Sequence, residues 1–298
     1  MKKFVAGIKR LSERHGTGPI SAVLKEGFIR SYRKPRVRRI LQFFFVKRLP
    51  RRMIFVVGVY NSGTTVVKDA IALHPDVCSA PIEGDRLSSA IAYFEQGGWP
   101  RAMFGNAYEI MKGRLRPTIN AEQFISDLRP WVRSNKWFLE KSISNSVRVP
   151  QLRKAFPGAK FIWVMREPEN VTKGIKKRSL PGPAVSKLLG SDTYPDDFLA
   201  LQWAFFSRLL LNDCEGQDDF YCCRYEQFLE SPVKLMGDIY KFIGVPDTQI
   251  EETEKGIAVS GRKLALHSGS AVENIESDPL TWVRNTIERV EKKLCLQD

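Results

Sequence analysis

The chain has 298 residues, of which 43% are hydrophobic, 11% aromatic and 27% charged, and this composition excludes disorder over most of its length. Its net charge of +14 is confined to one end, because residues 1–52 contain sixteen basic and two acidic side chains while the remainder is neutral. The sequence therefore predicts a basic N-terminal arm at residues 1–50 and a neutral globular domain at residues 51–298.

The cysteine and histidine content disfavours both a disulfide scaffold and a metal site. The five cysteines are odd in number, two are adjacent at Cys222 and Cys223, and there are only three histidines and no C-x-x-C pair. No apolar run approaches the roughly 20 residues of a membrane-spanning helix, and the N-terminus lacks the apolar core of a signal peptide. We therefore expect a cytoplasmic protein, without a bound metal, that can associate peripherally with a membrane.

The basic arm is predicted to be partly helical. Residues 4–11 and 20–32 show helical spacing of apolar side chains, and residues 36–45 mix arginine with aromatic residues. Three interpretations remain open: a solvated arm packed loosely on the body, attachment of residues 1–52 to an anionic membrane, or binding of nucleic acid. Nucleic-acid binding ranks last, because no recognition motif accompanies the basic residues.

From residue 53 onward the pattern predicts an α/β fold with a mostly parallel sheet and helices on both faces. Continuous apolar runs, typical of strands buried on both faces, lie at 53–59, 137–139, 160–164 and 220–224. Helices are predicted at 64–73, 85–96, 121–133, 146–155, 168–178, 196–213, 232–243 and 279–294. The stretches 97–120 and 179–195, rich in Gly, Pro and Arg, are predicted to be insertions or lid loops.

The strongest local signal is a glycine-bearing turn between the first predicted strand and its helix. Gly58 and Gly63 are five residues apart, which lets the chain wrap an anion with backbone N–H groups at a helix N-terminus. The hydroxyls of Ser62, Thr64 and Thr65 add donors suited to phosphate. A nucleotide-hydrolysing P-loop would carry Lys at the position of Thr64, so the turn predicts phosphate binding of another type.

This turn and three later segments resemble the sulfotransferases that use 3′-phosphoadenosine-5′-phosphosulfate (PAPS), and the resemblance implies a P-loop-like sulfotransferase fold. The SGTT sequence of residues 62–65, followed by a helix ending in His74-Pro75-Asp76, resembles the family's 5′-phosphosulfate loop. The later segments are FLEKS at 138–142 with FPGAKFI at 156–162, VMREPENV at 164–171, and RYEQF at 224–228 with FIGVP at 242–246. The resemblance covers residues 53–246, and more loosely 261–282.

The resemblance also implies which residues bind the donor. The residues implied for PAPS, and for its product 3′-phosphoadenosine-5′-phosphate (PAP), are Tyr60, Asn61, Ser62, Gly63, Thr64, Thr65, Arg166, Tyr225, Arg262 and Lys263. Two positions depart from the family pattern. Asn61 stands where the family carries Lys or Arg, and Gly174 stands where it tends to carry Ser. A neutral donor at Asn61 is nonetheless expected to act on the transferred sulfuryl group.

Two basic side chains are expected at the ligand-binding edge of the sheet. Lys141 follows the strand at 137–139 and is the candidate cation for the sulfuryl group, the alternative being a surface lysine paired with Glu140. Arg166 follows the strand at 160–164 and can bind the 3′-phosphate through two hydrogen bonds. The alternative for Arg166 is an Arg–Glu pair that caps the next helix.

Glu83 is the candidate base for the acceptor hydroxyl, with Asp85 as its substitute. Glu83 lies shortly after His74-Pro75, where members of this family place a catalytic glutamate, and a carboxylate in a cleft can have a tuned pKa. The alternative is a loop or N-cap acid. His74 is expected to have a capping role at the helix end instead of a catalytic one.

We therefore expect a PAPS-dependent sulfotransferase that transfers a sulfuryl group to a hydroxyl of a glycan, lipid or other small acceptor. Positioning and electrostatics dominate such transfers, as they do in phosphoryl transfer. The replacement of the usual cation by Asn61 leaves open a non-catalytic module that binds adenosine phosphates. A P-loop small-molecule kinase is a third alternative, disfavoured by the absence of the P-loop lysine.

Overall fold

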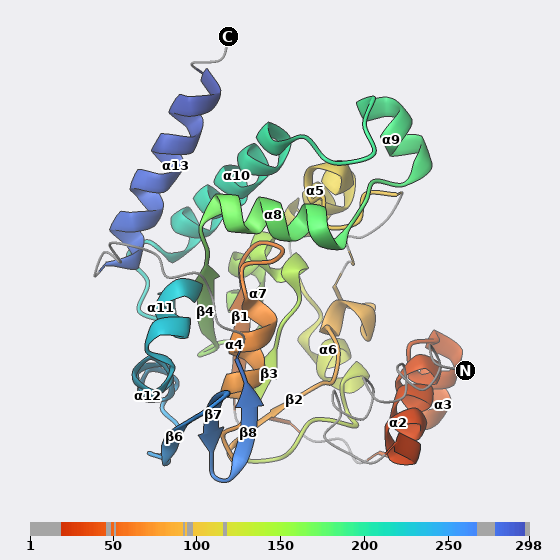
Figure 1. Cartoon of the computed structure of the whole chain (residues 1–298). Coiled ribbons are helices and arrows are strands. Elements are labelled where there is room, and N and C mark those ends of the chain that lie inside the picture. The colour runs from red at the N-terminus through yellow and green to blue at the C-terminus, as the bar shows by residue number, and fades with distance from the viewer. Residues whose placement is uncertain are drawn as a thin grey trace.

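Five parallel strands form the central sheet of the computed structural model, in the order β2-β3-β1-β4-β5 (Figure 1). The structure describes residues 19–45, 49–50, 52–91, 93, 98–115, 118–266 and 278–295. The strands are β1 (Arg52–Val57), β2 (Val77–Ser79), β3 (Trp137–Glu140), β4 (Lys160–Met165) and β5 (Phe220–Arg224). The predicted α/β class and all four predicted strands are confirmed, and β2 is added at one edge.

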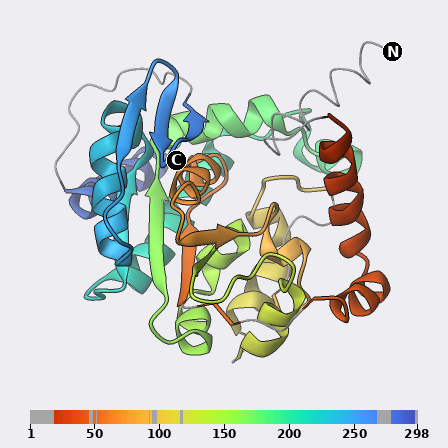
Figure 2. The same cartoon turned by 90° about the horizontal axis from the view of Figure 1, so that it is seen from below.

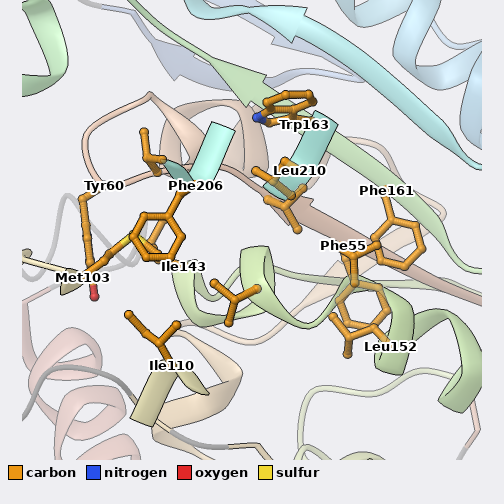
Figure 3. Close-up of a cluster of buried hydrophobic side chains, with 14 of the residues drawn as sticks. Phe55, Tyr60, Met103, Ile110, Ile143, Leu152, Phe161, Trp163, Phe206 and Leu210 are labelled. Carbon is orange, nitrogen blue, oxygen red and sulfur yellow. The ribbon is translucent and has the colours of Figure 1, made fainter. Parts of the chain in front are cut away.

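The alternation of side chains along the strands produces two separate cores. Phe55, Phe161 and Trp163 point to one face, where Figure 3 shows them among buried side chains such as Leu152 and Leu210. Ile54 and Val56 point to the opposite face and pack there with α4 and α12. A continuous apolar run was therefore the correct sign of a strand covered on both sides.

The helices predicted around the sheet are confirmed at most positions. They are α4 (Thr64–Ile71), α7 (Val149–Ala155), α8 (Pro168–Arg178), α10 (Asp196–Cys214), α12 (Pro232–Ile243) and α13 (Pro279–Cys295). A further helix, α11 (Tyr225–Glu230), was not predicted. A 3₁₀ segment, η3 (Ile143–Val147), precedes α7. Because α8 begins just after β4 ends, it crosses the carboxyl end of the sheet, as Figure 1 shows.

Two predicted helices differ from the structure. In the described part of the helix expected at 85–96, residues 85–91 and 93, the helical structure is one 3₁₀ turn, η1 (Gly84–Arg86). Ser88 Oγ donates to Asp127 Oδ2 at 2.9 Å and accepts from the Ala90 N–H at 3.0 Å. These side-chain bonds compete with helical ones. The helix expected at 121–133 is α6 (Ala121–Asp127), which ends early because Pro130 disfavours helical backbone before it.

The two stretches predicted as loops contain short helices. Residues 97–120 include η2 (Phe104–Asn106) and α5 (Ala107–Leu115), and residues 179–195 include α9 (Pro183–Leu189). A further unpredicted element is a small antiparallel sheet of β6 (Ile250–Thr253), β7 (Gly256–Val259) and β8 (Arg262–Ala265). Its strands are only four residues long, too short for a periodicity that distinguishes strand from loop.

The described part of the basic arm is packed closely on the body. It forms α2 (Pro19–Tyr32) and α3 (Pro35–Gln42), seen at the side of the sheet in Figures 1 and 2. Tyr32 is fully buried, with its ring centroid 5.2 Å from that of Trp131. The buried Arg38 forms an ion pair with Asp127 at 3.1 Å. The interpretation of a loosely packed arm is therefore wrong for residues 19–42, whereas residues 4–11 lie outside the described residues.

Candidate functional site

The turn after β1 forms the centre of the candidate site. Asn61 and Gly63 both have left-handed backbone, with φ of 62° and 95°, and α4 begins at the next residue. Successive N–H groups in such a turn form a concave site for an anion, which the helix N-terminus strengthens. The Ser62 hydroxyl is used inside the turn, where it donates to the Val59 carbonyl at 2.9 Å. Thr64 is buried, whereas Thr65 is exposed at the start of α4.

Two guanidinium groups converge on Asn61. Arg166 donates to the Asn61 backbone carbonyl at 3.0 Å, and Arg101 donates to the Asn61 side-chain oxygen at 3.0 Å. Within the described part of the chain, neither arginine is paired with a carboxylate. In the same part of the chain, the Asn61 Nδ2 and Arg166 Nε atoms are buried and have no hydrogen-bond partner. An anion beside these groups would accept from the unused donors and balance both cations, so this geometry fits a phosphate-bearing ligand.

Tyr225 joins this cluster through two contacts. The Arg166 guanidinium carbon lies 4.9 Å from the centre of the Tyr225 ring. The same ring packs directly on Gly63, where an added Cβ would lie 2.1 Å from it. Position 63 therefore requires glycine both for its positive φ and for this contact. The structure brings together Asn61, Gly63, Arg166 and Tyr225, four of the residues that the resemblance assigned to the donor.

On the other side of the turn, Lys141 and Glu83 form a tight ion pair. Lys141 follows the end of β3, and its Nζ lies 2.6 Å from Glu83 Oε1, while Arg86 Nε lies 2.9 Å from Glu83 Oε2. Both Lys141 and Glu83 line a cavity of about 230 Å³ that also reaches Thr65 and Lys68. The predicted cation and the predicted base thus share one cavity with the start of α4.

The alternatives considered for Lys141 and Arg166 are not what the structure shows, whereas Glu83 does lie in a loop at an N-cap position. Lys141 pairs with Glu83 and not with Glu140, which is buried and accepts hydrogen bonds from Gly84 N–H, Ser142 and Asn145. Arg166 does not pair with Glu167, whose carboxylate is instead held by Arg224 at 3.2 Å. Glu83 occupies the N-cap position of η1, but its side chain makes no capping hydrogen bond.

The two candidate bases have opposite electrostatic environments. Burial raises the pKa of Glu83, but the adjacent Lys141 and Arg86 outweigh burial and hold it below the usual range. Burial, together with the charge of Glu83, raises the pKa of Asp85 to about 7, although Ser144 donates to its Oδ2 at 2.6 Å. Asp85 does not line the cavity, whereas Glu83 and Glu140 do. Glu140 is only 2% exposed and accepts from Gly84, Ser142 and Asn145, so Glu83 is the carboxylate that an acceptor can reach.

Some predicted residues lie away from this site. The Tyr60 ring is buried in the core near Met103 and Phe206, as Figure 3 shows, so only its backbone faces the turn. Arg262 donates to the Leu73 carbonyl at 3.1 Å, past the C-terminal end of α4 and therefore away from its anion-binding N-terminus. Lys263 neighbours it on β8.

The position of His74 supports a structural role. Its ring accepts from the Asp76 N–H at 3.0 Å, and its other nitrogen lies 3.0 Å from the Pro246 carbonyl. Because both nitrogens are used within the fold, His74 joins the end of α4 to the residues after α12. It does not cap the helix carbonyls as expected, and it does not line the cavity around Glu83.

The two departures from the family pattern meet in space. An added Cβ at Gly174 would lie 3.3 Å from the Asn61 Cβ, so a larger residue on α8 would crowd Asn61 in its present orientation. The sequence analysis missed Arg101, which completes this group. Arg101 lies in a stretch predicted as a loop and has left-handed backbone with φ of 60°, which no sequence pattern indicated. Within the described residues, no cluster of His, Cys, Asp and Glu is arranged to hold a metal ion.

Comparison with known proteins identifies the class to which this site belongs. Residues 53–249 match the Sulfotransferase family, and the chain belongs to this family of transferase enzymes. A protein named "Putative protein-tyrosine sulfotransferase" from Caenorhabditis briggsae is 24% identical over 202 residues, which cover 66% of this chain and 67% of that protein.

The solved structures that this chain matches include other sulfotransferases. One from Alicyclobacillus acidocaldarius is 18% identical, with a TM-score of 0.48, covering 82% of this chain and 96% of its own. Another from Mycobacterium avium is 16% identical, with a TM-score of 0.46, covering 69% of this chain and 66% of its own. A mouse sulfotransferase complexed with PAP is 13% identical, with a TM-score of 0.34, covering 68% of this chain and 62% of its own.

Proposed function

We propose that this sulfotransferase uses PAPS as its donor and transfers the sulfuryl group to the hydroxyl of an acceptor bound beside Glu83. The observation that carries the proposal is the pair of guanidinium groups of Arg101 and Arg166 on Asn61, next to unused donors and, among the described residues, without a carboxylate partner. Such a cluster supports binding of a dianionic nucleotide end, because an anion can accept from the unused donors and balance both cations.

The residues around the turn fit an adenosine 3′,5′-bisphosphate group. The turn from Asn61 to Thr65 would hold the 5′-phosphate through backbone N–H groups, and Arg166 with Tyr225 would hold a second phosphate. When bound, PAPS supplies a sulfuryl group activated by its phosphate leaving group. Arg262 and Lys263 stay predictions for the donor site, although the structure gives Arg262 a partner elsewhere.

The chain's own contribution to the chemistry is proton transfer and charge stabilisation at Glu83 and Lys141. Glu83 is ionised at neutral pH because of Lys141 and Arg86, and it can accept the acceptor's hydroxyl proton at Oε1. Once Glu83 is protonated, it no longer attracts Lys141, so the ammonium group becomes available to the oxygens that gain charge. The ion pair thereby couples deprotonation of the acceptor to release of the cation.

We expect a peripheral association with anionic membranes through the arm, and a cytoplasmic location. Within the described ranges, no helix is both long and apolar enough to span a bilayer. Exposed on the arm are the basic residues Arg33, Lys34, Arg36 and Arg39 and the apolar residues Ile40, Phe43 and Phe44. This mixture suits the surface of an anionic membrane. Equal sedimentation with phosphatidylcholine vesicles that contain or lack phosphatidylserine would reject the attachment.

Nucleotide titration tests the donor assignment. We expect tight PAP binding without Mg²⁺, and weakening by about 1.5–3 kcal/mol in Arg166→Ala, the usual range for a hydrogen bond to a charged group. Calorimetry measures the affinity, and thermal unfolding shows whether the fold survives. A preference for Mg²⁺-ATP over PAP would reject the donor assignment, and unchanged PAP affinity with a sharp loss of stability would make Arg166 structural.

A further inference from the structure

A second cavity adjoins the one that contains Lys141 and Glu83, and the basic arm forms its far wall. This cavity has a volume of about 610 Å³ and shares Thr65, Lys68, Ala80 and Pro81 with the smaller one. Its opposite side is made by Leu24 and Phe28 of α2, and Trp131 also lines it. We refer to this second cavity as the arm groove. Its volume falls in the ordinary range of small-molecule sites.

The arm groove has an apolar wall opposite α4, and six of its eleven lining residues are apolar. Leu24, Phe28 and Trp131 present carbon surface to it from α2 and from the segment after α6. Lys68 is neutralised by Asp69, with 2.8 Å between Nζ and Oδ1, so the charge on the α4 side of the groove is balanced. Leu24 nevertheless remains 69% exposed, although it stands at the edge of a cavity. A large apolar side chain in this position gains most from a ligand that removes it from water.

The wall formed by α2 is held firmly by its C-terminal half. Phe28 and Tyr32 both pack on Trp131, with ring centroids 6.3 Å and 5.2 Å apart. The following helix is fixed by the buried ion pair between Arg38 and Asp127. The aromatic contacts with Trp131 and the Arg38–Asp127 ion pair therefore fix α2 and α3 on the body, so the wall of the groove is part of the fold.

We propose that the arm groove binds the apolar body of the acceptor, and that the acceptor is a long-chain or polycyclic alcohol of the lipid class. The proposal rests on the proposed function, since the acceptor's hydroxyl must reach Glu83 in the adjoining cavity. A free sugar or an extended peptide would need hydrogen-bond partners on all sides, whereas the polar groups of the groove are the Lys68–Asp69 ion pair, the Thr65 and Ser79 hydroxyls and Lys25, and the wall formed by Leu24, Phe28 and Trp131 offers carbon surface. An alcohol with an apolar body needs polar partners at only one end, where Glu83 and Lys141 lie.

The experiment compares two neighbouring substitutions on α2 in the full-length protein with PAP bound. Leu24→Asp places a charge in the groove, whereas Val23→Asp changes the adjacent residue, which is 44% exposed and does not line the groove. The probe is a dansyl-labelled undecanol, whose fluorescence rises on transfer to an apolar site. We expect Leu24→Asp to weaken probe binding about tenfold and to raise the KM for sulfation of 1-dodecanol, with little effect from Val23→Asp.

The outcomes separate this proposal from the proposed function. If PAP binds tightly but both variants bind the probe as the wild type does, or are weakened equally, the groove does not take the apolar body and this inference is wrong. Sulfation of free glucose or of a tyrosine-containing peptide in preference to 1-dodecanol would also overturn it. Failure of the protein to bind PAP would instead reject the donor assignment. An effect confined to Leu24→Asp, with unchanged PAP affinity, supports the arm groove.

Discussion

At the scale of single residues, the site depends on how positive charge is distributed around one turn. Asn61 stands where the resemblance to sulfotransferases implies Lys or Arg, and its neutral amide is contacted by Arg101 from a distant segment. Arg101 has left-handed backbone, which costs a non-glycine residue about 1 kcal/mol or more and persists where the surroundings enforce it. We therefore expect Arg101 to provide the positive charge at this end of the donor site.

Replacing Arg101 by glycine distinguishes the effect of its charge on donor binding from the effect of its backbone strain on stability. Arg101→Gly should leave thermal stability unchanged or higher, because glycine accepts the positive φ, while it weakens PAPS binding by about 1.5–3 kcal/mol. Adding Asn61→Lys to this variant should restore part of the affinity, since it moves the lost cation to the turn itself. Calorimetry with PAPS and PAP measures both effects. Full affinity in Arg101→Gly alone would show that Arg101 does not contact the donor.

Glu83 gives a second test at this scale. Glu83→Gln keeps a hydrogen-bond acceptor for Lys141 but cannot take a proton, so kcat should fall by about 10²- to 10⁴-fold while PAP affinity changes little. Kinetics with labelled PAPS provide the measurement. Glu215→Gln is the matched control, because Glu215 forms an exposed ion pair with Arg284 far along the chain. Retention of kcat in Glu83→Gln would leave Glu83 as a residue that only positions Lys141.

At the scale of elements, the most consequential feature is the docking of α2 and α3. Their sequence reads as a solvated basic arm, yet Tyr32, Ile29 and Arg38 are buried against the body. The packing of α3 on the body depends on one buried carboxylate, that of Asp127, which is only 1% exposed. Asp127 forms an ion pair with Arg38 and accepts a hydrogen bond from the Ser88 hydroxyl. The ion pair makes α3 part of the fold, and the preceding helix α2 forms one wall of the arm groove.

Arg38→Ala tests this docking. It leaves the charge of Asp127 buried without its cation, and we expect the free energy of unfolding to fall by about 3 kcal/mol. Urea unfolding followed by circular dichroism measures the loss. Arg36→Ala on the same helix serves as the comparison, because Arg36 is exposed and should cost under about 0.5 kcal/mol. Equal effects of the two substitutions would show that α3 is not held by this ion pair.

At the scale of the whole molecule, buried carboxylic acids lie close to the candidate site at the carboxyl end of the sheet. Burial raises the pKa of both Asp85 and Glu140. Glu140 lines the cavity that contains Glu83, and Asp85 lies two residues from Glu83 in the chain. A carboxyl whose pKa is raised by folding binds its proton more tightly in the native state than in the unfolded chain. Its contribution to stability is therefore complete at low pH and is lost as the pH rises through the folded pKa.

Asp85 makes this linkage measurable. With a folded pKa of about 7, Asp85 should reduce the free energy of unfolding by on the order of 2–3 kcal/mol between pH 5 and pH 8. Asp85→Asn keeps an acceptor for Ser144 and should remove this part of the pH dependence. Urea unfolding of both proteins at the two pH values tests the expectation. The same pH slope in both would place the pKa of Asp85 near its ordinary value.

Local features of the sequence determined the sheet, the turn and most helices. The run at 53–59 is apolar because β1 is covered on both faces, and Gly63 is required by the backbone of the turn itself. The positions of Lys141 and Arg166 at strand ends also follow from the sequence, because the carboxyl ends of parallel strands share one edge. Each of these features is decided by neighbours along the chain or by one strand's burial.

Only the tertiary structure decided which distant groups meet. Arg101 lies forty residues from Asn61 in a stretch without periodicity, and no local rule connects the two. Likewise, the charge pattern of residues 1–50 could not reveal that Arg38 finds a buried carboxylate 89 positions away at Asp127. Charge patterns describe how a segment behaves in water, whereas an ion pair in the interior depends on the partner that the rest of the fold places beside it.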